Sequence, residues 1–78
     1  MPEVIMYSNN CVKCKASDRD LSKLAKDGKI TYIHKDLTED KEADAYVRGL
    51  GIQQMPYIEA GDESWTGYDR NRIKALAA

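Results

Sequence analysis

The spacing of apolar residues predicts seven short elements, because it alternates between a period of two and a period near 3.6. Residues 3–8 and 30–35 are rich in apolar, β-branched and aromatic side chains, which is typical of strands. Residues 56–60 and 63–66 flank Gly61-Asp62, a pair that favours a tight hairpin. Helices are expected over residues 12–26, over 39–50 and over 70–76.

The second helix has the clearest pattern. Its apolar side chains recur at i, i+3, i+4 and i+7, so we expect them to form one buried face. These residues are Ala43, Tyr46, Val47 and Leu50. Thr38 precedes two acidic residues, which suit the first turn of a helix, and is therefore the predicted N-cap.

The other two helices have weaker patterns but recognisable ends. Asn10 or Ser8 could cap the first helix, and Gly28 fits its left-handed stop. Asp69 is the predicted cap of the last helix. The positions expected to face the core are Ala16, Leu21 and Leu24 in the first helix, and Ile73 and Leu76 in the last. Tyr68 and Ile73 are the predicted pair of a hydrophobic staple around the last cap.

The predicted order is therefore β-α-β-α-β-β-α. Two strands joined through a helix should be parallel, whereas the closing hairpin is antiparallel. An α/β fold with one four-stranded mixed sheet flanked by three helices is the simplest assembly. Seventy-eight residues suffice for one small domain, which we expect to span residues 1–78.

Amino-acid composition limits the classes of partner that the chain is expected to bind. The chain has 12 basic and 13 acidic residues and a net charge of −1, which argues against nucleic acid and anionic membrane. No apolar run approaches the roughly 20 residues of a membrane span, and the first residues lack a signal-peptide pattern. The expected location is the cytoplasm. In this reducing compartment a cysteine pair is expected to alternate between dithiol and disulfide rather than to form a structural cross-link.

The most informative chemistry lies in Cys11-Val12-Lys13-Cys14, which holds both cysteines of the chain. Three-residue spacing at the start of a helix brings the two thiols together on one face. Free N–H groups and the helix dipole there favour a thiolate, which is the reactive form. Lys13 and Lys15 add positive charge. We therefore expect dithiol–disulfide exchange, with Cys11 as nucleophile and Cys14 as resolving thiol.

Two other interpretations of the cysteines remain open. Zinc needs four ligands, and the chain adds only His34 to the two thiols, so a metal site would have to be shared between chains. An inert structural pair is less favoured, because so short a loop restrains the unfolded chain little.

Nearly the whole chain resembles the NrdH-redoxins, a glutaredoxin-like family of thiol redoxins with the thioredoxin fold. Three motifs in order support the resemblance. They are the Cys-x-x-Cys segment 11–14, the segment 50–56 that ends in Met55-Pro56, and Trp65-Thr66-Gly67-Tyr68. The Gly-Gly-x-Asp segment by which glutaredoxins hold glutathione is absent.

The resemblance implies a function. NrdH-redoxins carry electrons to class Ib ribonucleotide reductase and are reduced by thioredoxin reductase with NADPH. The family therefore implies a monomer with no bound cofactor, a redox-active Cys11–Cys14 disulfide, and NADPH used only through the reductase.

The resemblance also implies site residues besides the cysteines. Pro56 should follow a cis bond, and the Met55 backbone should face Cys11 and pair with an extended substrate segment. The surface that meets partners should include Tyr7, Val12, Lys13, Met55, Pro56, Trp65, Thr66, Gly67 and Tyr68. From the residues alone, Pro56 could simply open a strand, Trp65 could simply fill the core, and Tyr7 could pack on the core instead of the disulfide.

Two alternatives to a thioredoxin-reductase-dependent redoxin remain. One is a glutathione-dependent glutaredoxin, which shares the fold but takes electrons from another source. The other is a non-catalytic thioredoxin-fold or zinc-binding interaction module.

Overall fold

A computed structural model describes residues 2–77, so Met1 and Ala78, the ends of the predicted domain, lie outside it. The elements follow the predicted order: β1 (Glu3–Ser8), α1 (Val12–Lys26), β2 (Thr31–Asp36), α2 (Lys41–Gly49), β3 (Tyr57–Ala60), β4 (Glu63–Thr66) and α3 (Arg70–Ala75). No helix within the described residues is both long and apolar enough to cross a membrane.

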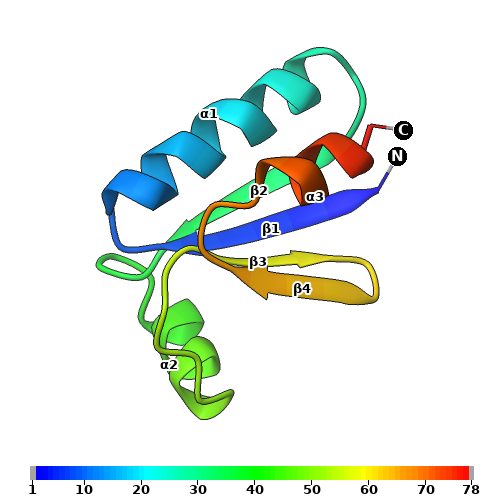
Figure 1. The fold of residues 1–78 in the computed structure, drawn as a ribbon. Helices are drawn as coiled ribbons and strands as arrows, with labels where there is room; N and C mark the ends of the chain where they lie inside the picture. Colours follow the sequence, from blue (N-terminus) through cyan, green and yellow to red (C-terminus); the bar gives the residue numbers. More distant parts are fainter. Residues whose placement is uncertain (1, 78) are drawn as a thin grey trace.

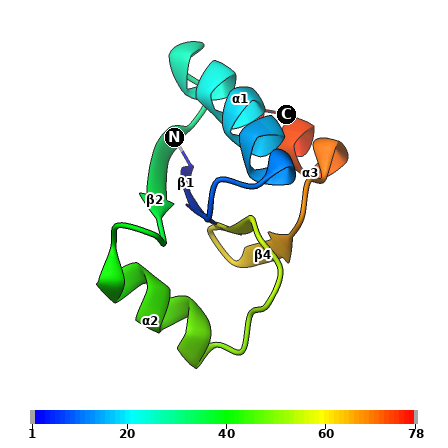
Figure 2. The same ribbon diagram turned by 90° about the vertical axis from the view of Figure 1, so that its left-hand side faces the viewer.

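One four-stranded sheet organises the molecule, with the strand order β2-β1-β3-β4. β1 runs parallel to β2 and antiparallel to β3, and β3 pairs antiparallel with β4. Figures 1 and 2 show α1 and α3 side by side on one face of the sheet and α2 alone on the other. The predicted mixed sheet with three flanking helices is therefore confirmed.

Alternation along β1 divides the core into two clusters, because successive side chains of a strand point to opposite faces. Val4 and Met6 pack with Leu21 of α1 and Ile73 of α3. Tyr7 packs instead under α2, in a cluster with Ala43, Val47 and Tyr57. The central strand thus holds both helical layers.

Helix α2 departs from its prediction at its start. Its N-cap is Asp40, which accepts from the Ala43 N–H at 3.0 Å, and the helix begins at Lys41. The prediction of Thr38 as cap was wrong, because the Thr38 N–H and hydroxyl both donate to Asp36 in the preceding turn. A side chain already used in a turn cannot also cap a helix.

The predicted apolar face of α2 is only half buried. Ala43 and Val47 are buried, whereas Tyr46 and Leu50 remain 45% and 48% exposed. A single helix on this face of a small sheet covers a narrow strip, so the flanking apolar positions stay at its margin.

Smaller differences concern element ends. β2 begins at Thr31, one residue after the predicted start, and β3 begins at Tyr57, after Pro56. Asp69 caps α3 as predicted, accepting from the Arg72 N–H at 3.1 Å. Gly28 and Gly61 have positive φ, as their predicted stop and turn require.

Two tyrosine hydroxyls beside α2 hydrogen-bond to the carboxylate of Glu59 in β3. Tyr46 and Tyr57 donate to its Oε2 at 2.5 and 3.0 Å. The hydrogen bond to Glu59 raises the pKa of Tyr46 to about 12. Burial first, and then the same carboxylate, raise the pKa values of Tyr57 and Tyr7.

We expect alkali to weaken the fold as Tyr46 ionises. Its folded pKa of about 12 lies above the ordinary 10.0, so its stabilising contribution is complete below pH 10 and is lost as the pH rises through 12. The urea midpoint should fall over this window, and Tyr46→Phe should reduce the fall. Phenolate absorbance of the folded protein should appear at higher pH than in denaturant; coinciding titrations would contradict the prediction.

Candidate functional site

Cys11 and Cys14 form a disulfide where β1 passes into α1, with Cα atoms 4.9 Å apart. Cys11 is itself the N-cap of α1, and its Sγ accepts from the Cys14 N–H at 3.1 Å. The predictions of Asn10 or Ser8 as cap were wrong. Ser8 is buried against His34, and Asn10 turns the chain with a φ of 66°.

This position fixes the electrostatics of the two sulfurs. The free N–H groups of the first turn and the helix dipole favour negative charge on a sulfur at the N-cap. When the disulfide is reduced, the same Cys14 N–H is placed to stabilise a Cys11 thiolate. Cys14 is only 2% exposed, whereas Cys11 is partly exposed, so an outside disulfide reaches Cys11 first.

Two loops bring an oxygen to each sulfur. The Met55–Pro56 peptide is cis, as the family resemblance implies, and the Met55 carbonyl oxygen lies 3.6 Å from the Cys11 Sγ. Asn9 Oδ1 lies 3.7 Å from the Cys14 Sγ. Sequence reasoning missed Asn9, since a loop asparagine outside the motif carries no spacing signal.

The surface around Cys11 is open. Val12 is 84% exposed, and Lys13 is also exposed. An apolar side chain held in water beside a reactive sulfur is suited to contact with another protein.

A groove with a volume of about 660 Å³ lies beside the two loops, between α2 and the segment that leads to Met55. Its apolar lining comes from Leu37, Val47, Ile52 and Met55, and Asn9, Thr38, Asp44, Arg48, Gly51 and Gln53 complete it. This groove could not be predicted from local sequence patterns, because its walls come from segments far apart in the chain.

The segment 65–68 divides between the Pro56 loop and the core. The Gly67 N–H donates to the Pro56 carbonyl at 2.8 Å, and Thr66 Oγ1 lies 3.4 Å from Gln54 Oε1. Trp65 is only 8% exposed and packs in the core cluster under α1 and α3. The Tyr68 hydroxyl donates to Asp20 of α1. Thr66 and Gly67 therefore support the active-site loop, whereas burial favours the core interpretation of Trp65.

Tyr7 lies under α2. Its ring centroid is 5.6 Å from that of Tyr46 and 5.7 Å from that of Tyr57. Tyr7 therefore packs in the core, which was the alternative to the predicted packing on the disulfide. The alternation of side chains along β1 directs it to the face opposite α1.

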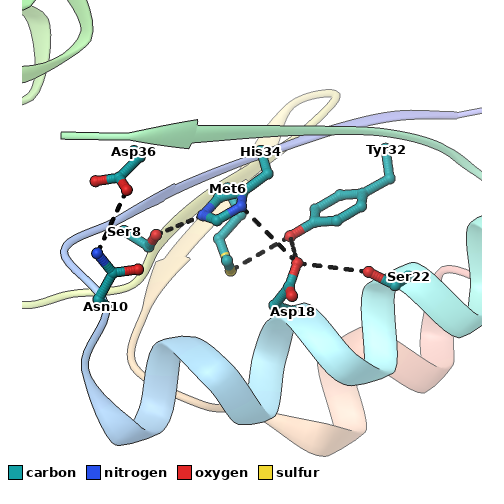
Figure 3. A network of polar contacts seen from close by, with 8 residues as sticks. All are labelled: Met6, Ser8, Asn10, Asp18, Ser22, Tyr32, His34 and Asp36. Atoms are coloured by element: carbon teal, nitrogen blue, oxygen red, sulfur yellow. Dashed lines mark hydrogen bonds and ion pairs between the residues drawn. The ribbon is translucent and has the colours of Figure 1, made fainter. Parts of the chain in front are cut away.

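A polar network ties β2 to α1 behind the site (Figure 3). His34 Nε2 hydrogen-bonds to the Ser8 hydroxyl, and the Tyr32 hydroxyl donates to Asp18 at 2.7 Å. Burial and this hydrogen bond raise the pKa of Tyr32. His34 Nδ1 lies 4.0 Å from Asp18. Both ring nitrogens thus face this network, and no three His, Cys, Asp or Glu side chains in residues 2–77 are grouped to hold a metal ion.

No family model matches the chain. The glutaredoxin-like protein NrdH of Salmonella typhimurium is 34% identical over 76 residues, which cover 97% of this chain and 89% of the relative. The Escherichia coli K12 protein of the same name is 32% identical over 72 residues, or 92% of this chain and 84% of the relative.

Solved structures agree with the sequence relatives. The glutaredoxin-like NrdH-redoxin of Escherichia coli, described as having a thioredoxin-like activity profile, aligns with a TM-score of 0.78 and 28% identity, covering 95% of this chain and 93% of that one. A glutaredoxin from Archaeoglobus fulgidus aligns with a TM-score of 0.73 and 23% identity over 97% and 86% of the two chains, which supports the fold alone.

Gly67→Ala tests the link between β4 and the Pro56 loop. Gly67 has a φ of 79°, and open space surrounds the position of an added Cβ, so the cost is backbone strain of about 1 kcal/mol. Gly49→Ala is the matched control, since Gly49 lies in α2 with equally open surroundings and without positive φ; it should stabilise by about 0.5 kcal/mol. Urea unfolding measures both, and equal effects would contradict the prediction.

Proposed function

Because the chain belongs to the NrdH glutaredoxin-like proteins, we propose that it donates electrons to protein disulfides, in particular those of a class Ib ribonucleotide reductase. The chain is a thiol–disulfide oxidoreductase with the Cys-x-x-Cys centre of its family. Thioredoxin reductase with NADPH returns it to the dithiol form. The observation that carries the proposal is the Cys11 sulfur at the N-cap of α1, facing the Met55 carbonyl.

The proposed reaction has two exchange steps. The Cys11 thiolate attacks one sulfur of the partner's disulfide; that S–S bond breaks as the Cys11–partner bond forms, and the other partner sulfur leaves as a thiolate. The Cys14 thiolate then attacks the Cys11 sulfur and displaces the second partner sulfur. Two electrons pass to the partner, whose sulfurs take up two protons, and the Cys11–Cys14 disulfide of the structure remains.

The loops around Cys11 support an extended partner segment. In this proposal the Met55 backbone pairs with the segment that carries the partner's disulfide, while Val12 and Lys13 contact it from the helix side. The groove beside Met55 offers apolar walls for its side chains. Pro56 and Gly67 hold the loop through the hydrogen bond between the Gly67 N–H and the Pro56 carbonyl.

The electron source is proposed from two observations. The related NrdH-redoxin from Escherichia coli is described by a thioredoxin-like activity profile. By the family resemblance, Trp65-Thr66-Gly67-Tyr68 of this chain stands where glutaredoxins carry Gly-Gly-x-Asp. Both favour thioredoxin reductase over glutathione. We also propose that residues 1–78 act as one domain, which the single sheet with its two core clusters supports. A cytoplasmic, monomeric protein is proposed from the family resemblance.

Turnover with two recycling systems tests the electron source. With NADPH and a disulfide substrate, we expect steady NADPH consumption with thioredoxin reductase and none above background with glutathione and glutathione reductase. The opposite pattern would replace the proposal with a glutathione-dependent glutaredoxin.

Cys14→Ser tests the order of the two thiols. The variant retains Cys11, so it should form a mixed disulfide that the missing second thiol cannot resolve. Non-reducing electrophoresis and mass spectrometry should find the adduct on Cys11. Cys11→Ser is the matched control and should form much less adduct, because its remaining thiol is buried. Equal trapping by both variants would contradict the assigned roles.

A further inference from the structure

Basic residues are concentrated in one helical layer, α1 and α3, whereas α2 in the other layer carries two basic and two acidic side chains. Helices α1 and α3 carry eight basic and two acidic side chains, a net charge of +6. Since the whole chain carries −1, the rest of it carries −7, which includes the two aspartates that cap these helices, Asp27 and Asp69. Both helices lie on the same face of the sheet (Figure 2), so the excess positive charge covers one side of the molecule.

The cations of this layer are exposed, and two of them, Arg19 and Arg72, pair with Asp20 and Asp69. All eight basic residues of α1 and α3 are exposed. Asp18 accepts from Tyr32 and Ser22, and Asp20 accepts from Tyr68 and pairs with Arg19. Burial alone would raise the pKa of Asp20, but the hydrogen bonds from Tyr68 and Arg19 lower it overall. Within residues 2–77, the other six basic side chains of α1 and α3 have no ion-pair partner, so most of the positive charge is uncompensated.

Four of these cations form one line along α1. Lys15, Arg19, Lys23 and Lys26 follow each other at spacings of four, four and three residues, which places them on one face of a helix. We call these four residues the basic stripe. The buried residues of the helix, Cys14, Ser17 and Leu21, lie on the opposite face. The stripe starts beside exposed Val12 and leads away from Cys11.

We propose that the basic stripe docks a carboxylate-rich segment of the protein whose disulfide Cys11 attacks. This inference rests on the proposed function. At 1.5 Å of rise per residue, Lys26 lies about 22 Å along the helix from Cys11. The far end of the stripe therefore does not reach the reacting sulfurs and acts by attracting and orienting the partner.

The continuity between the stripe and the redox centre favours a protein over other polyanions. A ligand that binds along the stripe has one end at Cys11. The reaction at Cys11 needs a disulfide in that ligand. Helix α1 has no aromatic residue on which nucleic-acid bases could stack. The strong negative charge of the remaining structure also favours a local acidic segment over an extended polyanion.

Single-turnover reduction of synthetic peptides tests the proposal without any recycling enzyme. The peptides share one intramolecular disulfide and differ only in a flank of four Glu, four Gln or four Lys residues. At low salt the reduced protein should react about tenfold faster with the Glu peptide than with the Gln peptide, and more slowly with the Lys peptide. Added salt should reduce the difference, because the Debye length shrinks to about 10 Å at 0.1 M.

Lys23→Glu should lower the preference for the Glu peptide at least about threefold, through the loss and reversal of one stripe charge. Lys41→Glu is the matched control; it changes net charge equally at an exposed position of α2 and should leave the preference unchanged. The rate with the Gln peptide should be the same in both variants.

Three outcomes would overturn the inference. If the Gln peptide is not reduced at all, the proposed function itself fails. If all three peptides react at one rate, the redox function stands and the docking surface fails. If the Glu peptide has no advantage while a single-stranded oligonucleotide or a phosphatidylserine vesicle binds the same protein and Lys23→Glu abolishes that binding, the stripe serves a different partner.

Discussion

The placement of one sulfur at the end of one helix is the constraint on which the site depends. Cys11 ends the loop after β1 and caps α1. Its Sγ therefore accepts a hydrogen bond from the N–H of Cys14, with which it forms the disulfide. No separate capping residue stands between the strand and the reactive group. The geometry of the disulfide is therefore tied to the geometry of the helix start, and anything that holds α1 on the sheet also holds the redox centre.

Much of this arrangement could be predicted from local sequence. The order of elements, the parallel pairing of β1 and β2 and the cap at Asp69 follow from short-range patterns that the structure confirms. The features that could not be predicted depend on distant partners. Thr38 fails as a cap because Asp36 engages it, and Ser8 fails because His34 does. A capping preference describes what a side chain can do locally, whereas the tertiary structure decides which of its possible partners it meets.

The distribution of charge is another feature that the net charge of the sequence does not describe. Nearly equal numbers of acidic and basic residues argue against an anionic partner only when the two signs are mixed on the surface. Here α1 and α3 place eight basic side chains on one face of the sheet, whereas α2 on the other face carries two basic and two acidic ones (Figure 1). The periodicity of Lys15, Arg19, Lys23 and Lys26 was present in the sequence. Its meaning required the buried face of α1 and the position of α3.

The segment 65–68 shows how core and site share residues in so small a protein. Trp65 packs between the sheet and the helices, and Arg72 of α3 lies over its ring at 5.7 Å from the centroid. Two residues later, the Gly67 N–H holds the carbonyl of Pro56. The buried indole thus anchors β4, and the backbone just beyond it holds the loop that faces Cys11. The segment 65–68 resembles a partner-binding motif in the sequence, but it supports the site indirectly. Its buried side chain stabilises the core, and its main chain positions the active-site loop.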